Sequence, residues 1–276
     1  MAKVLKRNVS DFMKLLQKSA RRHNQGWYHY TVMSSLMKMK STSTALFSLI
    51  SKSNDASEFD ANRHYMMSFS FGSAESIAMW GIYGIPRKEA VRLKFSQTTI
   101  SRWIENMKES RLEVYGVVPG RRLVDLSIHP LKVIVSDVAY YGKNAIVQHK
   151  DKKYLVRDES KVDVSYNDSP LAPYIKKWPW SYEQEVRVVV EFEEPVLDSK
   201  GEPYEKIAVD FLEPLDELFS KEGEVMLGPW CKRSPSTVRN NGLSCANVVS
   251  SEFTGLLRLR TACDICKKVK KSNSKN

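Results

Sequence analysis

Residues 181–192 read SYEQEVRVVVEF, and the alternation within this stretch decides the fold. The even-numbered residues from Val186 onward are apolar, whereas Glu183, Glu185 and Arg187 are charged. Because successive side chains of a strand point to opposite faces, the pattern predicts a core-facing apolar side and a polar side near the start of the strand. Two interpretations of the charged row remain open. It is either a functional site or a solvated ion-pair ladder on an edge strand.

Outside this strand, the chain predicts a mostly β core with a few helices. The order does not follow a regular strand–helix alternation, so we expect the α+β class, with a mixed, mostly antiparallel β core and flanking short helices. The apolar runs predict strands that end near Tyr30 and that cover 46–50, 65–71, 91–95, 207–211, 225–227 and 256–259. Short apolar runs alternate with turns over 112–166, for example in VIVSDVAYYG (133–142), and predict a β-rich region there. The 3.6-residue periodicity and the capping residues predict helices over 32–40, 73–80 and 98–109.

Composition excludes several classes of protein. With 276 residues, 42% hydrophobic and only 12 Gly and 11 Pro, the chain is neither collagen-like nor wholly disordered. No run approaches 18 apolar residues and no secretory signal is present, so we expect no membrane span and a cytoplasmic location. Four cysteines are too few for a secreted disulfide scaffold.

The net charge of +11 is concentrated at the two ends of the sequence. Residues 1–26 carry +6 and residues 263–276 carry +4, which leaves the body close to neutral. We therefore divide the chain into a basic amphipathic helix, a single α+β domain, an extension of that domain and a basic tail that we expect to be disordered. These parts cover residues 1–26, 27–230, 231–262 and 263–276 respectively.

The basic N-terminal helix predicts an apolar face and a cationic face. Ser10 is a plausible N-cap, and Lys14, Lys18, Arg21 and Arg22 fall on the cationic face. Such a face suits the phosphates of nucleic acid or an anionic membrane surface. The alternative is a solvated outer face on a helix that packs against the body.

Three further motifs carry polar or aromatic groups, and each has a structural alternative. WYHYT (27–31) contains His29, which is either a ligand group or a half-buried structural histidine. The loop NDASE (54–58) offers Asn54, Asp55 and Glu58, or forms an ordinary Asx turn. MWGIYG (79–84) places Trp80 and Tyr83 on one helix face, a spacing typical of core packing.

The cysteines allow one test for a metal. A structural zinc would need four thiolates, and the chain has one CxxC pair where a zinc ribbon has two. Unlinked thiols are therefore favoured over zinc, and we expect no other metal. The four candidate ligands are Cys231, Cys245, Cys263 and Cys266.

Taken in order, the motifs resemble a bacterial and phage family of unknown function. They run WYHYT, SNDASEF, SFSFG, ESIAMWGIYG and WPWSYEQEVRVVV, and the resemblance spans roughly residues 27–228. Ser68 departs from the family, whose members often have Cys before the FS pair. The segment from Cys231 onward has no counterpart in it.

That family is in turn similar to ADP-ribosyltransferases of the His-Tyr-Glu kind, and the resemblance implies NAD as a substrate. It implies that His29 contacts the NAD ribose, that Tyr83 or Trp80 stacks on nicotinamide, and that Glu185 or Glu183 is the catalytic carboxylate. The second Glu would be kept ionised by Arg187, which could instead hold the pyrophosphate. Further cofactor-binding residues implied by the motifs are Tyr30, Thr31, Asn54, Asp55 and Glu58.

Three functional hypotheses follow. The first is an NAD-consuming ADP-ribosyltransferase-like enzyme with nucleic acid as acceptor or docking surface, acting in conflict between bacteria and phage. The second is a non-catalytic module that binds nucleic acid through its basic ends. The third is a nuclease that would use Glu183 and Glu185 with a metal and would lose activity on chelation.

Overall fold

In the computed structural model of the chain, the predicted strand is β13 (Glu185–Glu191), and it lies inside a sheet. It pairs antiparallel with β4 (His64–Ser70) on one side and with β8 (Lys132–Asp137) on the other. The even-numbered apolar side chains lie in the main core, as predicted. The edge-strand interpretation is wrong, because six of the seven residues of β13 are buried and both of its edges are paired.

The large sheet has eleven strands and is mostly antiparallel. Among the strands that the structure describes in this sheet, the one parallel pair joins β15 to β16. In spatial order the path runs through β16 (Asn247–Ser250), β15 (Glu224–Leu227), β5 (Ala90–Phe95), β2 (Trp27–Val32), β4, β3 (Thr44–Leu49), β14 (Lys206–Asp210), β6 (Val114–Gly116) and β7 (Val124–Asp125), with β13 and β8 branching from β4.

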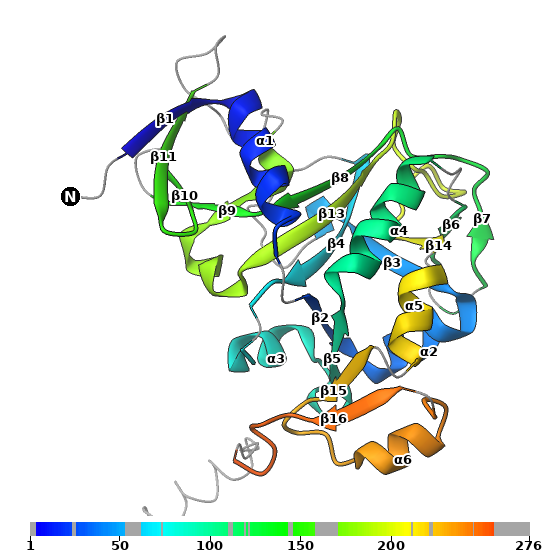
Figure 1. Cartoon of the computed structure of the whole chain (residues 1–276). Coiled ribbons are helices and arrows are strands. Elements are labelled where there is room, and N and C mark those ends of the chain that lie inside the picture. The colour runs from blue at the N-terminus through cyan, green and yellow to red at the C-terminus, as the bar shows by residue number, and fades with distance from the viewer. Residues whose placement is uncertain are drawn as a thin grey trace, which may run out of the picture.

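A second sheet of five strands packs against one end of the first (Figure 1). Two of its four strand pairs are parallel and two are antiparallel. The order is β1 (Val4–Asn8), β11 (Lys152–Arg157), β10 (Ile146–His149), β9 (Ala139–Tyr141) and β12 (Ile175–Lys177). The predicted α+β class, with mostly antiparallel sheets and short helices, is therefore confirmed.

Six helices cover the sheets within the residues that the structure describes. The predicted helix over 98–109 is α4, and the helix predicted over 73–80 starts later, because the Ser76 side chain caps it by accepting from Met79 N. No described helix has the apolar length needed to cross a bilayer. The helices are α1 (Val9–Ala20), α2 (Met33–Thr42), α3 (Ile77–Tyr83), α4 (Gln97–Glu109), α5 (Leu212–Phe219) and α6 (Pro235–Asn240), with 3-10 turns η1 (Ile50–Lys52), η2 (Arg87–Glu89), η5 (Ala172–Tyr174) and η6 (Trp178–Glu183).

The structure describes twelve stretches of the chain. Several predictions fall outside them, namely those for the loop residues Asn54, Asp55 and Glu58, for three of the four cysteines, for the tail 263–276 and for most of the predicted strand 256–259. Cys231 is described and is a free thiol. The described residues are 4–23, 26–52, 62–72, 74–109, 113–118, 120, 122–142, 146–157, 171–210, 212–220, 223–244 and 246–256.

Helix α1 packs on the small sheet and on β8 and turns its cations outward. Its cap is Asn8 rather than Ser10, since the Asn8 side chain accepts from Asp11 N at 2.8 Å. Phe12 and Leu16 are fully buried in the core of the small sheet. The four predicted cationic residues, Lys14, Lys18, Arg21 and Arg22, are all exposed.

A buried carboxylate joins the end of α1 to both sheets. Asp137, at the end of β8, is fully buried and lies 2.6 Å from His23 Nε2 and 2.9 Å from His149 Nε2. Burial alone would raise the pKa of Asp137, but the hydrogen bonds from the two imidazoles hold it at about 2.

We expect Asp137→Ala to lower the free energy of unfolding by about 3 kcal/mol at pH 7, because two buried imidazoles lose their partner. The Asp137 carboxyl has a depressed pKa, so its contribution is present above its usual value of 3.8 and is lost as the pH falls through about 2. Guanidinium unfolding at several pH values measures this difference. Asp151→Ala, in an exposed turn, is the matched control, and an equal loss in both variants would contradict the assignment.

The large sheet has a gap beside strand β4. Strand β4 pairs with β13 along one edge, while its other edge is shared between two strands. Tyr28 of β2 lies opposite Ser70, and Ser48 of β3 lies opposite Met66. Between these two pairs, the edge of β4 around Ser68 faces a split between β2 and β3.

Candidate active site

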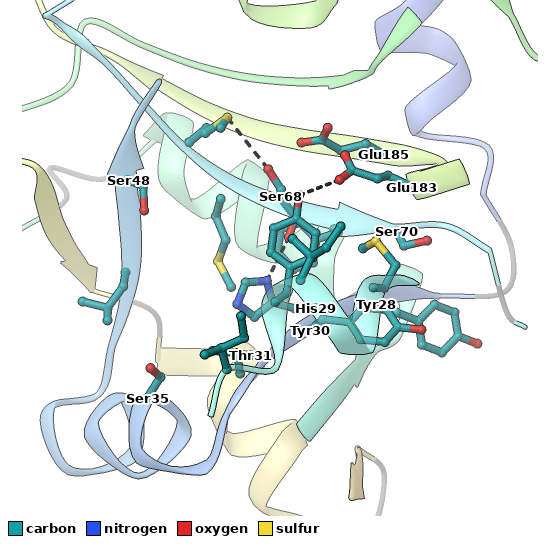
Figure 2. A pocket seen from close by; sticks show the side chains of 18 of the residues that line it. Tyr28, His29, Tyr30, Thr31, Ser35, Ser48, Ser68, Ser70, Glu183 and Glu185 are labelled. Atoms are coloured by element: carbon teal, nitrogen blue, oxygen red, sulfur yellow. Dashed lines mark hydrogen bonds between the residues drawn. The ribbon is translucent and has the colours of Figure 1, made fainter. Parts of the chain in front are cut away.

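A pocket of about 380 Å³ lies at this split (Figure 2). Strands β2, β3 and β4 and helices α2 and α3 contribute to its walls. Four residues from three separate sequence motifs line it together, namely His29, Tyr83, Glu183 and Glu185. The fold therefore brings together an imidazole, a phenol and two carboxyls that lie up to 156 positions apart in the sequence.

His29 occupies the gap in the sheet. Its Nδ1 lies 2.8 Å from the carbonyl oxygen of Ser68, which can only accept a hydrogen bond. Nδ1 therefore carries the proton, and Nε2 remains available to a ligand. Burial lowers the pKa of His29 despite this bond, so the ring is neutral at pH 7.

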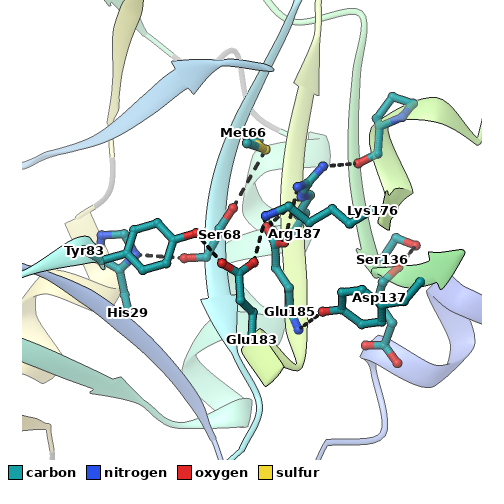
Figure 3. A network of polar contacts seen from close by, with 12 residues as sticks. His29, Met66, Ser68, Tyr83, Ser136, Asp137, Lys176, Glu183, Glu185 and Arg187 are labelled. Carbon is teal, nitrogen blue, oxygen red and sulfur yellow. Dashed lines mark hydrogen bonds and ion pairs between the residues drawn. The ribbon is translucent and has the colours of Figure 1, made fainter. Parts of the chain in front are cut away.

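The strand pattern predicted that Glu183 and Glu185 lie on one face of a single strand, but the structure places them in two different elements. Glu183 ends η6 and is not part of β13, and Gln184 between the two acids is left-handed with φ of 44°. This turn brings both side chains to one ammonium group. Lys176 Nζ lies 2.7 Å from Glu183 Oε2 and 3.1 Å from Glu185 Oε2 (Figure 3).

Lys176 is a residue of the candidate site that sequence reasoning missed. It lies on β12 of the small sheet, is only 4% exposed and sits 5.0 Å from the centre of the Trp180 ring. Nothing in its local sequence pattern distinguishes a buried lysine from an exposed one. The adjacent Lys177 is exposed.

Arg187 holds Glu185 in place and does not line the pocket. The guanidinium is fully buried, with Nε 2.7 Å from Glu185 Oε1 and Nη2 3.2 Å from Oε2. Its Nη1 donates to the carbonyl oxygen of Pro173 at 2.7 Å. The expectation that Arg187 contacts the cofactor is therefore not met. Arg187 instead positions the neighbouring carboxylate of Glu185. This agrees with the other role considered for it, which was to keep one of the two glutamates ionised.

The two acids have pKa values shifted in opposite directions. Burial raises the pKa of Glu183 to about 7, and the negative charge of Glu185 adds to this effect. Burial would raise the pKa of Glu185 as well, but Arg187 and Lys176 outweigh it and hold this pKa far below its usual value. At neutral pH the site therefore has one firmly ionised carboxylate and one that exchanges a proton.

The aromatic candidates separate into one pocket residue and one core residue. Tyr83 lines the pocket, and its hydroxyl donates to Glu183 Oε1 at 2.6 Å. Trp80 is fully buried against Tyr30, and its Nε1 donates to Glu75 Oε2 at 3.0 Å. The expectation that Trp80 contacts a cofactor is therefore wrong, because its ring is packed in the core.

The chain matches no family model, no curated protein and no solved structure. What the site can do is therefore inferred from its own residues and distances. Among the residues that the structure describes, no cluster of three or more His, Cys, Asp or Glu side chains could hold a metal.

The remaining candidates divide by location. Tyr30 and Thr31 of β2 line the pocket beside His29. The cations of α1 lie outside the pocket.

A neutral imidazole, a phenol and a carboxylate pair of opposite pKa shifts suit the binding of a polar ring system and the stabilisation of positive charge during bond cleavage.

Proposed function

We propose that the protein is an NAD-dependent, ADP-ribosyltransferase-like enzyme that cleaves the bond between nicotinamide and ribose. The observation that carries the proposal is the convergence of His29, Tyr83, Glu183 and Glu185 on one pocket. We infer an ADP-ribosyltransferase-like fold on the same ground, with the dinucleotide entering where the large sheet splits between β2 and β3.

The proposed reaction uses the two carboxylates differently. As the C1′–N bond breaks, nicotinamide leaves with the bonding electron pair and positive charge builds on the ribose. Glu185, ionised at neutral pH, stabilises that charge. Glu183, with a pKa of about 7, accepts the proton of the nucleophile that attacks C1′.

His29 and Tyr83 position the substrate in this proposal. The bond from Nδ1 to Ser68 fixes the imidazole, so that Nε2 accepts a hydrogen bond from a ribose hydroxyl. Tyr83 places its ring against nicotinamide, and its hydroxyl keeps Glu183 in reach of the reacting carbon.

Nucleic acid is the acceptor or docking partner that we propose. The exposed cations of α1 suit a phosphate backbone. The end of this helix lies near the pocket, because the ring of His23 stacks on Phe71 with centroids 4.0 Å apart, and Phe71 follows the last residue of β4. A strand bound along α1 would pass close to the carboxylate end of the site.

Calorimetric titration with NAD tests the proposal. Wild type is expected to bind NAD, and His29→Ala to bind it roughly tenfold more weakly, because one hydrogen bond is lost. His29→Asn keeps a donor for the Ser68 carbonyl but lacks Nε2, so it is expected to fold and to show the same loss. The exposed His129→Ala, outside the pocket, is the control. Wild type that does not bind NAD would overturn the proposal.

A further inference from the structure

The end of the pocket away from the two carboxylates is basic. Lys206 begins β14 directly opposite Ser48 of β3, and both residues line the pocket. Cross-strand partners place their side chains on the same face of a sheet, so the ammonium and the hydroxyl share this wall. Ser48 lies well apart from Glu183 and Glu185 in the pocket (Figure 2).

A second cation follows the strand that carries Ser48. Lys52 closes η1, the 3-10 turn that follows β3, and its side chain also lines the pocket. Thr31 and Ser35 add hydroxyls on either side of the start of α2. The first turn of α2 contains no acidic residue, so nothing in it opposes an anion beside these lysines.

The charges of the pocket are therefore separated along its length. The acidic side chains among its described lining residues are Glu183 and Glu185, and both contact Lys176 at one end. Lys52 and Lys206 are exposed, and Lys206 lies beside Ser48, on the wall apart from the carboxylates (Figure 2). A ligand that matches both ends has an electrophilic, electron-poor group at the carboxylates and an anionic group at the two lysines.

We propose that Lys52 and Lys206 form a subsite for the phosphate groups of the substrate. This inference rests on the proposed function and specifies the class of substrate that the enzyme takes. The pocket selects phosphorylated nicotinamide nucleotides over the unphosphorylated riboside. Ser48 and Ser35 supply hydroxyl donors to the same phosphate oxygens.

Calorimetry with two truncated probes tests this subsite. Nicotinamide mononucleotide carries a phosphate and nicotinamide riboside does not. Wild type is expected to bind the mononucleotide roughly tenfold more tightly, and higher salt is expected to weaken the mononucleotide alone. The double variant Lys52→Met with Lys206→Met is expected to lose this preference and to bind the riboside as wild type does. Lys200→Met with Lys232→Met, at exposed positions outside the pocket, is the matched control.

The outcomes separate the subsite from the function on which it rests. If wild type binds both probes equally, or if the double variant keeps the preference for the mononucleotide, the phosphate subsite is overturned while binding of the nicotinamide moiety stands. If wild type binds neither probe nor NAD, the proposed function fails, and the subsite fails with it.

Discussion

Replacing Glu185 by Gln is expected to slow the release of nicotinamide from NAD by roughly 10³-fold. The amide has nearly the same shape as the carboxylate and still accepts from Arg187, but it carries no charge to stabilise the forming cation. Release of nicotinamide, with either water or nucleic acid as acceptor, measures the effect. Glu183→Gln is expected to lower the same rate and also to remove its rise with pH near 7.

Controls are needed because Glu185 also neutralises buried cations. Glu191→Gln, at the other end of β13 and beside Arg63 and Lys132, is expected to leave the rate within about twofold of wild type. Thermal unfolding of each variant separates loss of folding from loss of chemistry. Full activity in folded Glu185→Gln and Glu183→Gln proteins would contradict the proposed catalytic role of these carboxylates. It would favour the interpretation that they belong to a buried network that only stabilises the fold.

Lys176→Met is the second large effect, with an expected loss of roughly 10²-fold at pH 7. Lys176 opposes the rise in the pKa of Glu183, so removing its charge raises that pKa further above about 7. If the rate requires ionised Glu183, the rise of activity with pH is expected to move upward by roughly one to three pH units. A pH–rate profile measures this shift.

Two companion variants make the Lys176 result specific. Lys177→Met changes the exposed neighbour and is expected to keep both rate and pH profile. Lys176→Arg keeps the charge and is expected to restore a profile close to that of wild type. A profile for Lys176→Met that does not move, in a folded protein, would show that Lys176 does not control the proton on Glu183.

Local sequence patterns predicted individual strands and helices better than they predicted which strands lie side by side in the sheets. The alternation in residues 186–192 placed the apolar face of β13 correctly, and the 3.6-residue periodicity predicted the helix α4. The pattern could not show that β13 is central, because its partners β4 and β8 are distant in the sequence. The strands β1, β12 and β16 and the helices α5 and α6 were not predicted.

The candidate site was predicted only in part, for related reasons. His29, Tyr83, Glu183 and Glu185 line one pocket, and the motifs contained all four. Strand parity misplaced Glu183, because a left-handed residue breaks the alternation before Glu185.

The missed residues have a common physical cause. Lys176, Lys52 and Lys206 have no local signature, since most lysines lie on the surface and sequence alone does not indicate which ones face a cavity. Trp80 was linked to the cofactor only by the family resemblance, whereas its spacing from Tyr83 on one helix face is typical of core packing. In the fold, only Tyr83 of the two reaches the pocket.

The most direct test of the proposed function is an experimental structure of the Glu185→Gln variant with NAD. We expect nicotinamide against the ring of Tyr83, a ribose hydroxyl at His29 Nε2, and the anomeric carbon facing residues 183 and 185. NAD bound elsewhere on the protein, or a pocket that stays closed to it at saturating concentration, would contradict the proposal.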